Sequence, residues 1–70
     1  MIEIYHNCKI KIADYSEYDA KFTFAYGGEF TAICKLAHNA YALTGYMRDI
    51  VPVDITVENG SIIKVEPHEG

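Results

Sequence analysis

The chain has 70 residues, half of them apolar, and a formal net charge of −4 from ten acidic and six basic side chains. This length predicts one domain over residues 1–70, and the apolar fraction is too high for a disordered chain. The acidic balance argues against nucleic acid as a partner, because phosphate binding needs basic side chains. No apolar run is long enough to cross a bilayer. The start of the chain lacks a secretory signal, so we expect a cytoplasmic protein with two reduced cysteines.

The charge is unevenly distributed along the chain. Residues 13–30 carry −3 and residues 49–70 carry −4, whereas residues 31–48 carry +2. A surface divided in this way suits a basic protein partner better than a phosphate backbone or an anionic membrane. An acidic surface that only keeps a small protein in solution would explain the same distribution.

The first twelve residues alternate in character, which is typical of a half-buried strand. One face holds Ile2, Ile4, His6, Cys8, Ile10 and Ile12. Asn7 tolerates turn conformations, but a hairpin turn there would break the common isoleucine face. We therefore expect one long bent strand rather than a hairpin.

The middle of the chain predicts a hairpin followed by a helix. Residues 21–26 read as an aromatic-rich strand, and Gly27-Gly28 favours a two-residue turn into a return strand that extends from Glu29 to about Leu36. Alanines favour a helix over residues 37–47, with Gly45 as its C-terminal stop. The alternative is a single helix over residues 29–45, because the apolar residues from Phe30 onward also fit a helical stripe.

The last third predicts a second hairpin. Residues 51–57 alternate, Asn59-Gly60 is a strong turn signal, and residues 62–66 form the return strand. The fold class is therefore α+β, with about five antiparallel strands and one helix in the order strand, strand, strand, helix, strand, strand. A small OB-like barrel has this element order. The alternative helix over residues 29–45 would leave a four-stranded sheet.

Two pairs of residues form a candidate metal site. His6 and Cys8 share a face of a strand, and Cys34 and His38 share a face of a helix, so together they would make a Cys₂His₂ zinc site. The usual Cys-x₂-Cys spacing is absent, and buried cysteine commonly acts as a small apolar residue. We therefore expect no bound metal and no cofactor, with these four residues as the ligands to test.

The chain offers little for catalysis. A Cys–His nucleophile needs an orienting group and an oxyanion site, for which 70 residues leave little room. Gly27-Gly28 lacks the lysine and the hydroxyl residue of a phosphate-binding loop. The C-terminal part holds two carboxylate pairs, Asp49 with Asp54 and Glu66 with Glu69, and we expect all four to be solvated. Acid–base catalysis needs one carboxylate of a pair to be more buried than the other, so that their pKa values differ. We expect that the protein is not an enzyme.

The most unusual feature is tyrosine, with six residues and no tryptophan. Tyrosine supplies rigid, amphipathic contact area and is enriched at interface hot spots. Two tyrosines lie in an acidic connector between the first two predicted strands. We therefore predict a partner-binding face made of Asp14, Tyr15, Glu17, Tyr18 and Asp19.

Three functions are consistent with these features. The first is a protein-binding module that occludes a larger basic partner, as small acidic inhibitors from phages and mobile elements do, for example anti-CRISPR or anti-restriction proteins. The second is an OB-like binder of single-stranded nucleic acid or a nucleotide, with Phe22, Phe24 and Tyr26 as stacking platforms. The third is a structural or regulatory subunit whose sheet edge pairs with another chain, including a second copy of itself.

Overall fold

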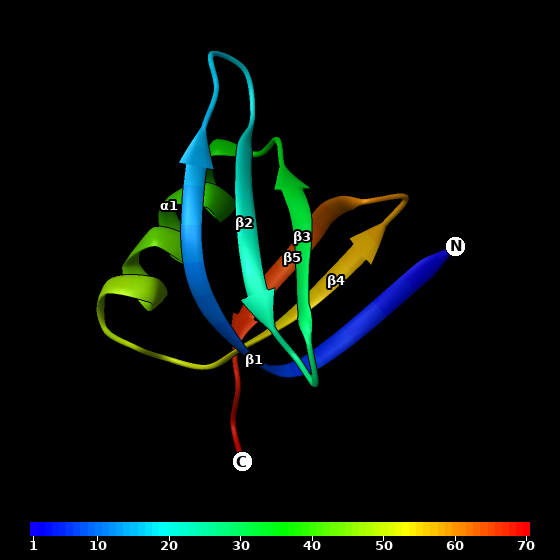
Figure 1. Ribbon diagram of the computed structural model, residues 1–70, viewed down its shortest axis with the longest axis vertical. Coiled ribbons are helices and arrows are strands. Elements are labelled where there is room, and N and C mark those ends of the chain that lie inside the picture. The colour runs from blue at the N-terminus through cyan, green and yellow to red at the C-terminus, as the bar shows by residue number, and fades with distance from the viewer.

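The computed structural model describes all 70 residues and contains five strands and one helix (Figure 1). The elements are β1 (Ile2–Tyr15), β2 (Ala20–Ala25), β3 (Glu29–Cys34), α1 (Ala37–Arg48), β4 (Val53–Glu58) and β5 (Ser61–Pro67). The α+β class and the element order are confirmed. The alternative helix over residues 29–45 was wrong, because β3 occupies its first six positions. No helix is both long and apolar enough to cross a membrane.

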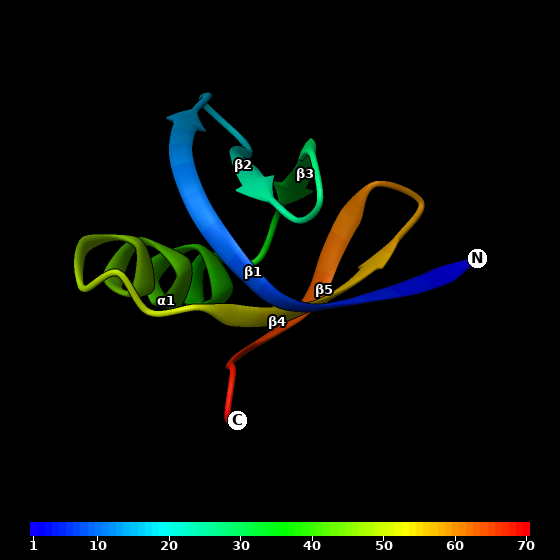
Figure 2. The ribbon, with the colours of Figure 1, turned by 60° about the horizontal axis from the view of Figure 1, so that its bottom comes forward.

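The strands close into a barrel in the order β1-β2-β3-β5-β4. The long β1 curves so that its N-terminal half pairs with β4 and its C-terminal half pairs with β2 (Figure 2). The contact between β3 and β5 is parallel and consists of one residue pair, Ile33 with Ser61. The sheet is therefore mixed, whereas the sequence predicted only antiparallel strands. This order, with the helix between the third and fourth strands, is that of an OB-type barrel.

Two β-bulges in β1 reverse the direction of its side chains. The register shifts between Tyr5 and Cys8 and again between Ile10 and Ile12. Each bulge adds one residue to β1 relative to its partner strand, so the alternation of inward and outward side chains is inverted after it. The long bent strand is confirmed, but the common isoleucine face was wrong. Three of the isoleucines point outward: Ile2 is 58% exposed, Ile4 59% and Ile12 62%.

Of the two predicted hairpin turns, the β4–β5 turn has the expected length and the β2–β3 turn does not. Asn59 and Gly60 have positive φ values of 51° and 80° between the paired residues Glu58 and Ser61, which confirms a two-residue turn. The β2–β3 turn has three residues, because Ala25 pairs with Glu29. The predicted two-residue Gly27-Gly28 turn was therefore one residue too short.

The apolar core fills the barrel and extends beneath α1. The fully buried side chains come from four strands and the helix: Phe22, Phe24, Leu43, Ile55, Val53, Cys8 and Cys34. Burying one phenylalanine or leucine side chain contributes about 1.5–3 kcal/mol to folding. Much of the core therefore consists of a few large side chains that point inward from β2 and β4.

The helix ends in a different way from the predicted glycine stop. Gly45 lies inside α1, which continues to Arg48. The carbonyl of Tyr46 accepts the N–H of Val51 at 2.8 Å, and the carbonyl of Met47 accepts the N–H of Ile50 at 3.3 Å. These two bonds form a Schellman motif. The position that glycine usually fills is occupied by Ile50, with a φ of 57°.

Candidate protein-binding site

The loop between β1 and β2 is held closed by a serine. The hydroxyl of Ser16 donates to the carbonyl of Asp19 at 2.9 Å and accepts the N–H of Asp19 at 3.0 Å. The N–H of Ser16 donates to the same carbonyl at 2.8 Å. Three hydrogen bonds therefore join the two ends of a four-residue loop. Its tip consists of Glu17 and Tyr18.

The two tyrosines of the predicted binding face have different roles. Tyr18 is 82% exposed at the tip of the loop. The hydroxyl of Tyr15 forms a hydrogen bond with the hydroxyl of Thr44 in α1, and its ring lies edge-on to Phe22 with the centroids 6.2 Å apart. Tyr15 therefore ties the end of β1 to the helix and the core. Tyr18 is the more exposed of the two, since Tyr15 is 57% exposed.

The base of the loop opens into a shallow hollow of about 260 Å³. Asp14, Tyr15 and Asp19 from the predicted face line it, together with Ser16, Lys21 and Ile33. Lys21 lies opposite Asp14 in the β1–β2 ladder, and Ile33 is 37% exposed. Glu17 and Tyr18 do not line the hollow. The five predicted residues therefore form one continuous loop region with a hollow base and a projecting aromatic tip.

The aromatic platform expected for a nucleic-acid binder is absent from the surface. Phe22 and Phe24 are 0% exposed, because both point into the barrel from β2. Tyr26 is 47% exposed but lies in the β2–β3 turn. The prediction of three stacking platforms was wrong for both phenylalanines.

The four candidate zinc ligands are not brought together. The bulge after Tyr5 places Cys8 in the core, whereas His6 points outward toward Asp54. Cys34 ends β3, so it does not share a helical face with His38, which lies exposed in α1. The pairing of faces predicted for each half of the site was therefore wrong. No group of three or more His, Cys, Asp or Glu side chains is placed to hold a metal ion.

Both cysteines are free thiols in the core. Burial raises the pKa of Cys8 to about 11, and the negative charge of Asp54 adds to this effect. Burial also raises the pKa of Cys34, although a hydrogen bond with the backbone of Leu36 acts in the opposite direction. A thiolate is the reactive form of cysteine, and both thiols stay protonated near neutral pH. They pack as apolar side chains.

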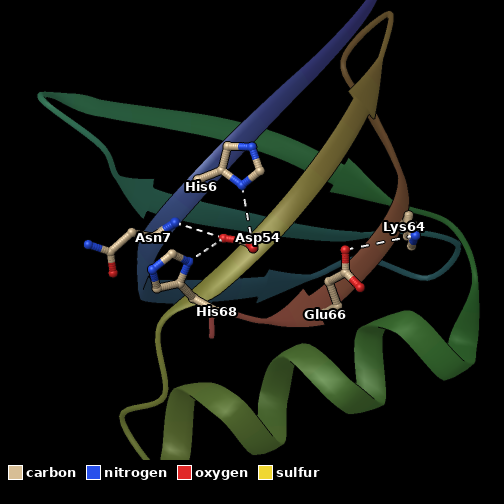
Figure 3. A network of polar contacts seen from close by, with 6 residues as sticks. All are labelled: His6, Asn7, Asp54, Lys64, Glu66 and His68. Carbon is tan, nitrogen blue, oxygen red and sulfur yellow. Dashed lines mark hydrogen bonds and ion pairs between the residues drawn. The ribbon is translucent and has the colours of Figure 1, made fainter. Parts of the chain in front are cut away.

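A polar cluster around Asp54 was missed by the sequence-based prediction (Figure 3). One oxygen of the carboxylate accepts the backbone N–H of Asn7 at 2.9 Å and lies 2.9 Å from Nδ1 of His68. The other oxygen lies 3.4 Å from Nδ1 of His6. Asp54 was expected to be solvated, but its side chain is only 18% exposed. Asn7, with its tolerance of positive φ, was the available signal, and it was interpreted only as a possible turn.

Several opposing effects set the pKa of Asp54. The N–H of Asn7 lowers the pKa of this carboxyl most strongly, and burial raises it. The imidazoles of His68 and His6 lower the pKa further, so the net direction is downward. The carboxylate therefore stays ionised and links the bulge of β1 to the C-terminal segment. The cluster joins residues of β1, β4 and the segment after β5.

The three carboxylates of the loop differ in burial. Asp14 and Glu17 are exposed, whereas Asp19 is half-buried. The cluster at Asp54 lies on a different part of β1 and does not contribute to this loop. Comparisons with protein-family models, with curated proteins and with solved structures found no match to this chain.

Proposed function

We propose that this chain is a non-enzymatic protein-binding module that contacts a larger, basic partner through the β1–β2 loop. The observation that carries this proposal is Tyr18, which is 82% exposed between the carboxylates of Glu17 and Asp19. An aromatic ring at the tip of a short loop gains contact area on binding and loses few rotamers. In the free chain the ring of Tyr18 is exposed to water and gains no such contact area.

The negative charge around the ring of Tyr18 indicates which kind of surface would bind it. Asp14, Glu17 and Asp19 lie within six residues, and the only cation nearby in the sequence is Lys21. A concentrated negative field attracts a basic surface and raises the association rate, an effect that salt weakens. The partner that fits this loop is therefore a protein with a basic patch beside an apolar pocket for the ring.

The hydrogen bonds of the loop support the same proposal. Ser16 and Asp19 are joined by three bonds, so the loop is ordered before it meets a partner. A loop that is already ordered loses less conformational entropy on binding. The small size and net charge of −4 suit an inhibitor that occludes its target, of the kind that phages and mobile elements carry.

A second candidate function rests on the free edge of β1. Residues 2–5 pair with β4 on one side, and β2 pairs with β1 only from Lys9 onward, so the other edge of this segment has no partner strand. Ile2 and Ile4 point outward there. An extended, apolar strand edge is a site for pairing with a strand of another chain. We propose a second copy of this chain as the pairing partner, in a structural or regulatory assembly.

The main proposal is tested by binding kinetics with the partner recovered by affinity purification from the source cell. The double variant Asp14→Lys/Glu17→Lys is expected to slow association at low salt, and Tyr18→Ala is expected to speed dissociation. Tyr41→Ala is the matched control, because Tyr41 is 84% exposed on α1. If both loop variants stay folded and bind as the parent does, the loop is a solvated connection and the proposal fails.

A further inference from the structure

A second hollow lies between β1 and the connection from α1 to β4. Its volume is about 100 Å³, and its apolar walls include Ile10 from β1, Tyr46 from α1 and Val51 from the connection. Figure 1 shows this connection at the opposite end of the molecule from the β1–β2 loop. The hollow is therefore separate from the β1–β2 loop, and a binding role for it does not rest on the proposed function.

The wall of this hollow contains a strained residue. Ile50 lines the hollow and has a φ of 57°, a conformation that a β-branched residue adopts only at a cost in free energy. Glycine would complete the same Schellman motif without that cost. The side chain of Ile50 is 86% exposed, so burial in the folded chain does not offset the strain. A contact with another molecule would explain why an isoleucine is present here.

The rim of the hollow provides two polar groups. Lys9 belongs to none of the five ion pairs of the chain, although the chain is acidic overall. Asn7 gives its backbone N–H to Asp54, while its side-chain amide points away from that carboxylate (Figure 3). An amide group supplies both a donor and an acceptor, which is the complement of a peptide group. The rim therefore combines a free cation with a peptide-like hydrogen-bonding group.

We propose that this hollow binds the C-terminal residue of a partner protein chain. The volume suits one aliphatic side chain, which would pack between Ile10, Tyr46 and Ile50. The terminal carboxylate would pair with Lys9, and the side chain of Asn7 would bond the last peptide group. Capture of a terminal carboxylate is a known mode of peptide recognition. The charge of Lys9 is what selects a chain end over an internal segment.

The test is an NMR titration of the ¹⁵N-labelled full chain with the peptide Gly-Ser-Gly-Ser-Leu. We expect shifts at the amides of Lys9, Ile10 and Val51, and about tenfold weaker binding of the same peptide with a C-terminal amide, because the charge-assisted contact is lost. A peptide that ends in glycine should also bind more weakly. Equal binding of acid and amide, shifts confined to other regions, or no shifts at all would overturn the proposal.

Two variants separate a binding role from a structural one. Ile50→Gly should raise the melting temperature, because it removes the strain, and should weaken peptide binding. Lys9→Gln should weaken binding of the free acid and leave the amide unaffected, whereas Lys35→Gln, at an exposed position on the segment before α1, should change neither. A lower melting temperature of Ile50→Gly, or unchanged peptide binding by either Ile50→Gly or Lys9→Gln, would contradict the inference.

Discussion

The backbone N–H of Asn7 donates a 2.9 Å hydrogen bond to the carboxylate of Asp54 across the first bulge of β1. The bond holds the extra residue of β1 outside the ladder, where Asn7 has a positive φ of 56°. Every side chain from this point to the second bulge faces the opposite side from the one that strict alternation predicts. The carboxylate of Asp54 is thus bonded to β1 at the point where the alternation of its side chains reverses.

The first prediction concerns the acid stability that Asp54 provides. The pKa of this carboxyl is lowered chiefly by the N–H of Asn7, so its contribution to stability is present above the ordinary pKa of aspartate, about 4, and is lost as pH falls through the lowered value. Asp54→Ala should lower the melting temperature at neutral pH and should lose less stability on acidification than the parent. Thermal denaturation across the acid range measures both effects.

The control for this variant is Asp49→Ala, since the side chain of Asp49 is 65% exposed. It should leave both the melting temperature and the acid profile close to those of the parent. If Asp54→Ala and Asp49→Ala behave alike, the hydrogen bond to Asn7 does not hold the bulge in place.

The second prediction concerns the thiols at alkaline pH. Burial raises the pKa of Cys8 to about 11, so the folded chain keeps a proton that the unfolded chain releases from about pH 9 upward. The free energy of unfolding should therefore fall in this range, by at most about 1.4 kcal/mol per pH unit for each thiol. Urea denaturation at several alkaline pH values measures the decline. In Cys8→Ala the decline should be smaller, and an equal decline would show that Cys8 is not the cause.

The third prediction concerns the β4–β5 turn. Gly60 has a φ of 80°, which valine resists, so Gly60→Val should destabilise the fold by about 1–2 kcal/mol. For a domain of this size that corresponds to a fall in melting temperature of several degrees. Gly28→Val is the control, because Gly28 lacks a positive φ and has open space around it. Equal melting temperatures for the parent and Gly60→Val would argue against this turn.

The fourth prediction separates the two tyrosines of the loop. Tyr15→Phe removes the hydrogen bond to Thr44 and should cost about 1 kcal/mol of stability. Tyr18→Phe should cost nothing measurable, since the hydroxyl of Tyr18 has no partner within the chain and the residue is 82% exposed. Urea denaturation of both variants provides the comparison. A larger loss in Tyr18→Phe than in Tyr15→Phe would reverse the assignment of their roles.

Element order could be predicted from local signals in the sequence. The Asn59-Gly60 turn, the alanines of α1 and the alternation in β4 are determined by neighbouring residues. The structure confirms the hairpin and the helix, which was predicted over residues 37–47 and ends one residue later, at Arg48. Strand alternation, by contrast, locates a face only when the ladder has no bulge. The two bulges of β1 depend on contacts with distant residues, such as Asp54, which lies 47 positions after Asn7.

The sites show the same division between local and distant information. The acidic loop could be identified from composition, because its charges and tyrosines are adjacent in sequence. The different roles of Tyr15 and Tyr18 could not be predicted, since they depend on the position of Thr44 in α1. The hollow beside Ile50 could not be predicted either. Its walls come from β1, α1 and the connection from α1 to β4, and a strained isoleucine has no local sequence signature.

The central claim is that Tyr18 contacts a basic protein partner. A photoreactive phenylalanine analogue placed at position 18 tests it most directly, with the same analogue at position 41 as the control, because Tyr18 and Tyr41 are 82% and 84% exposed. Irradiation in the source cell followed by mass spectrometry should give one basic protein cross-linked through position 18 and not through position 41. Equal cross-linking from both positions, or a cross-link from position 41 alone, would contradict the proposed binding site.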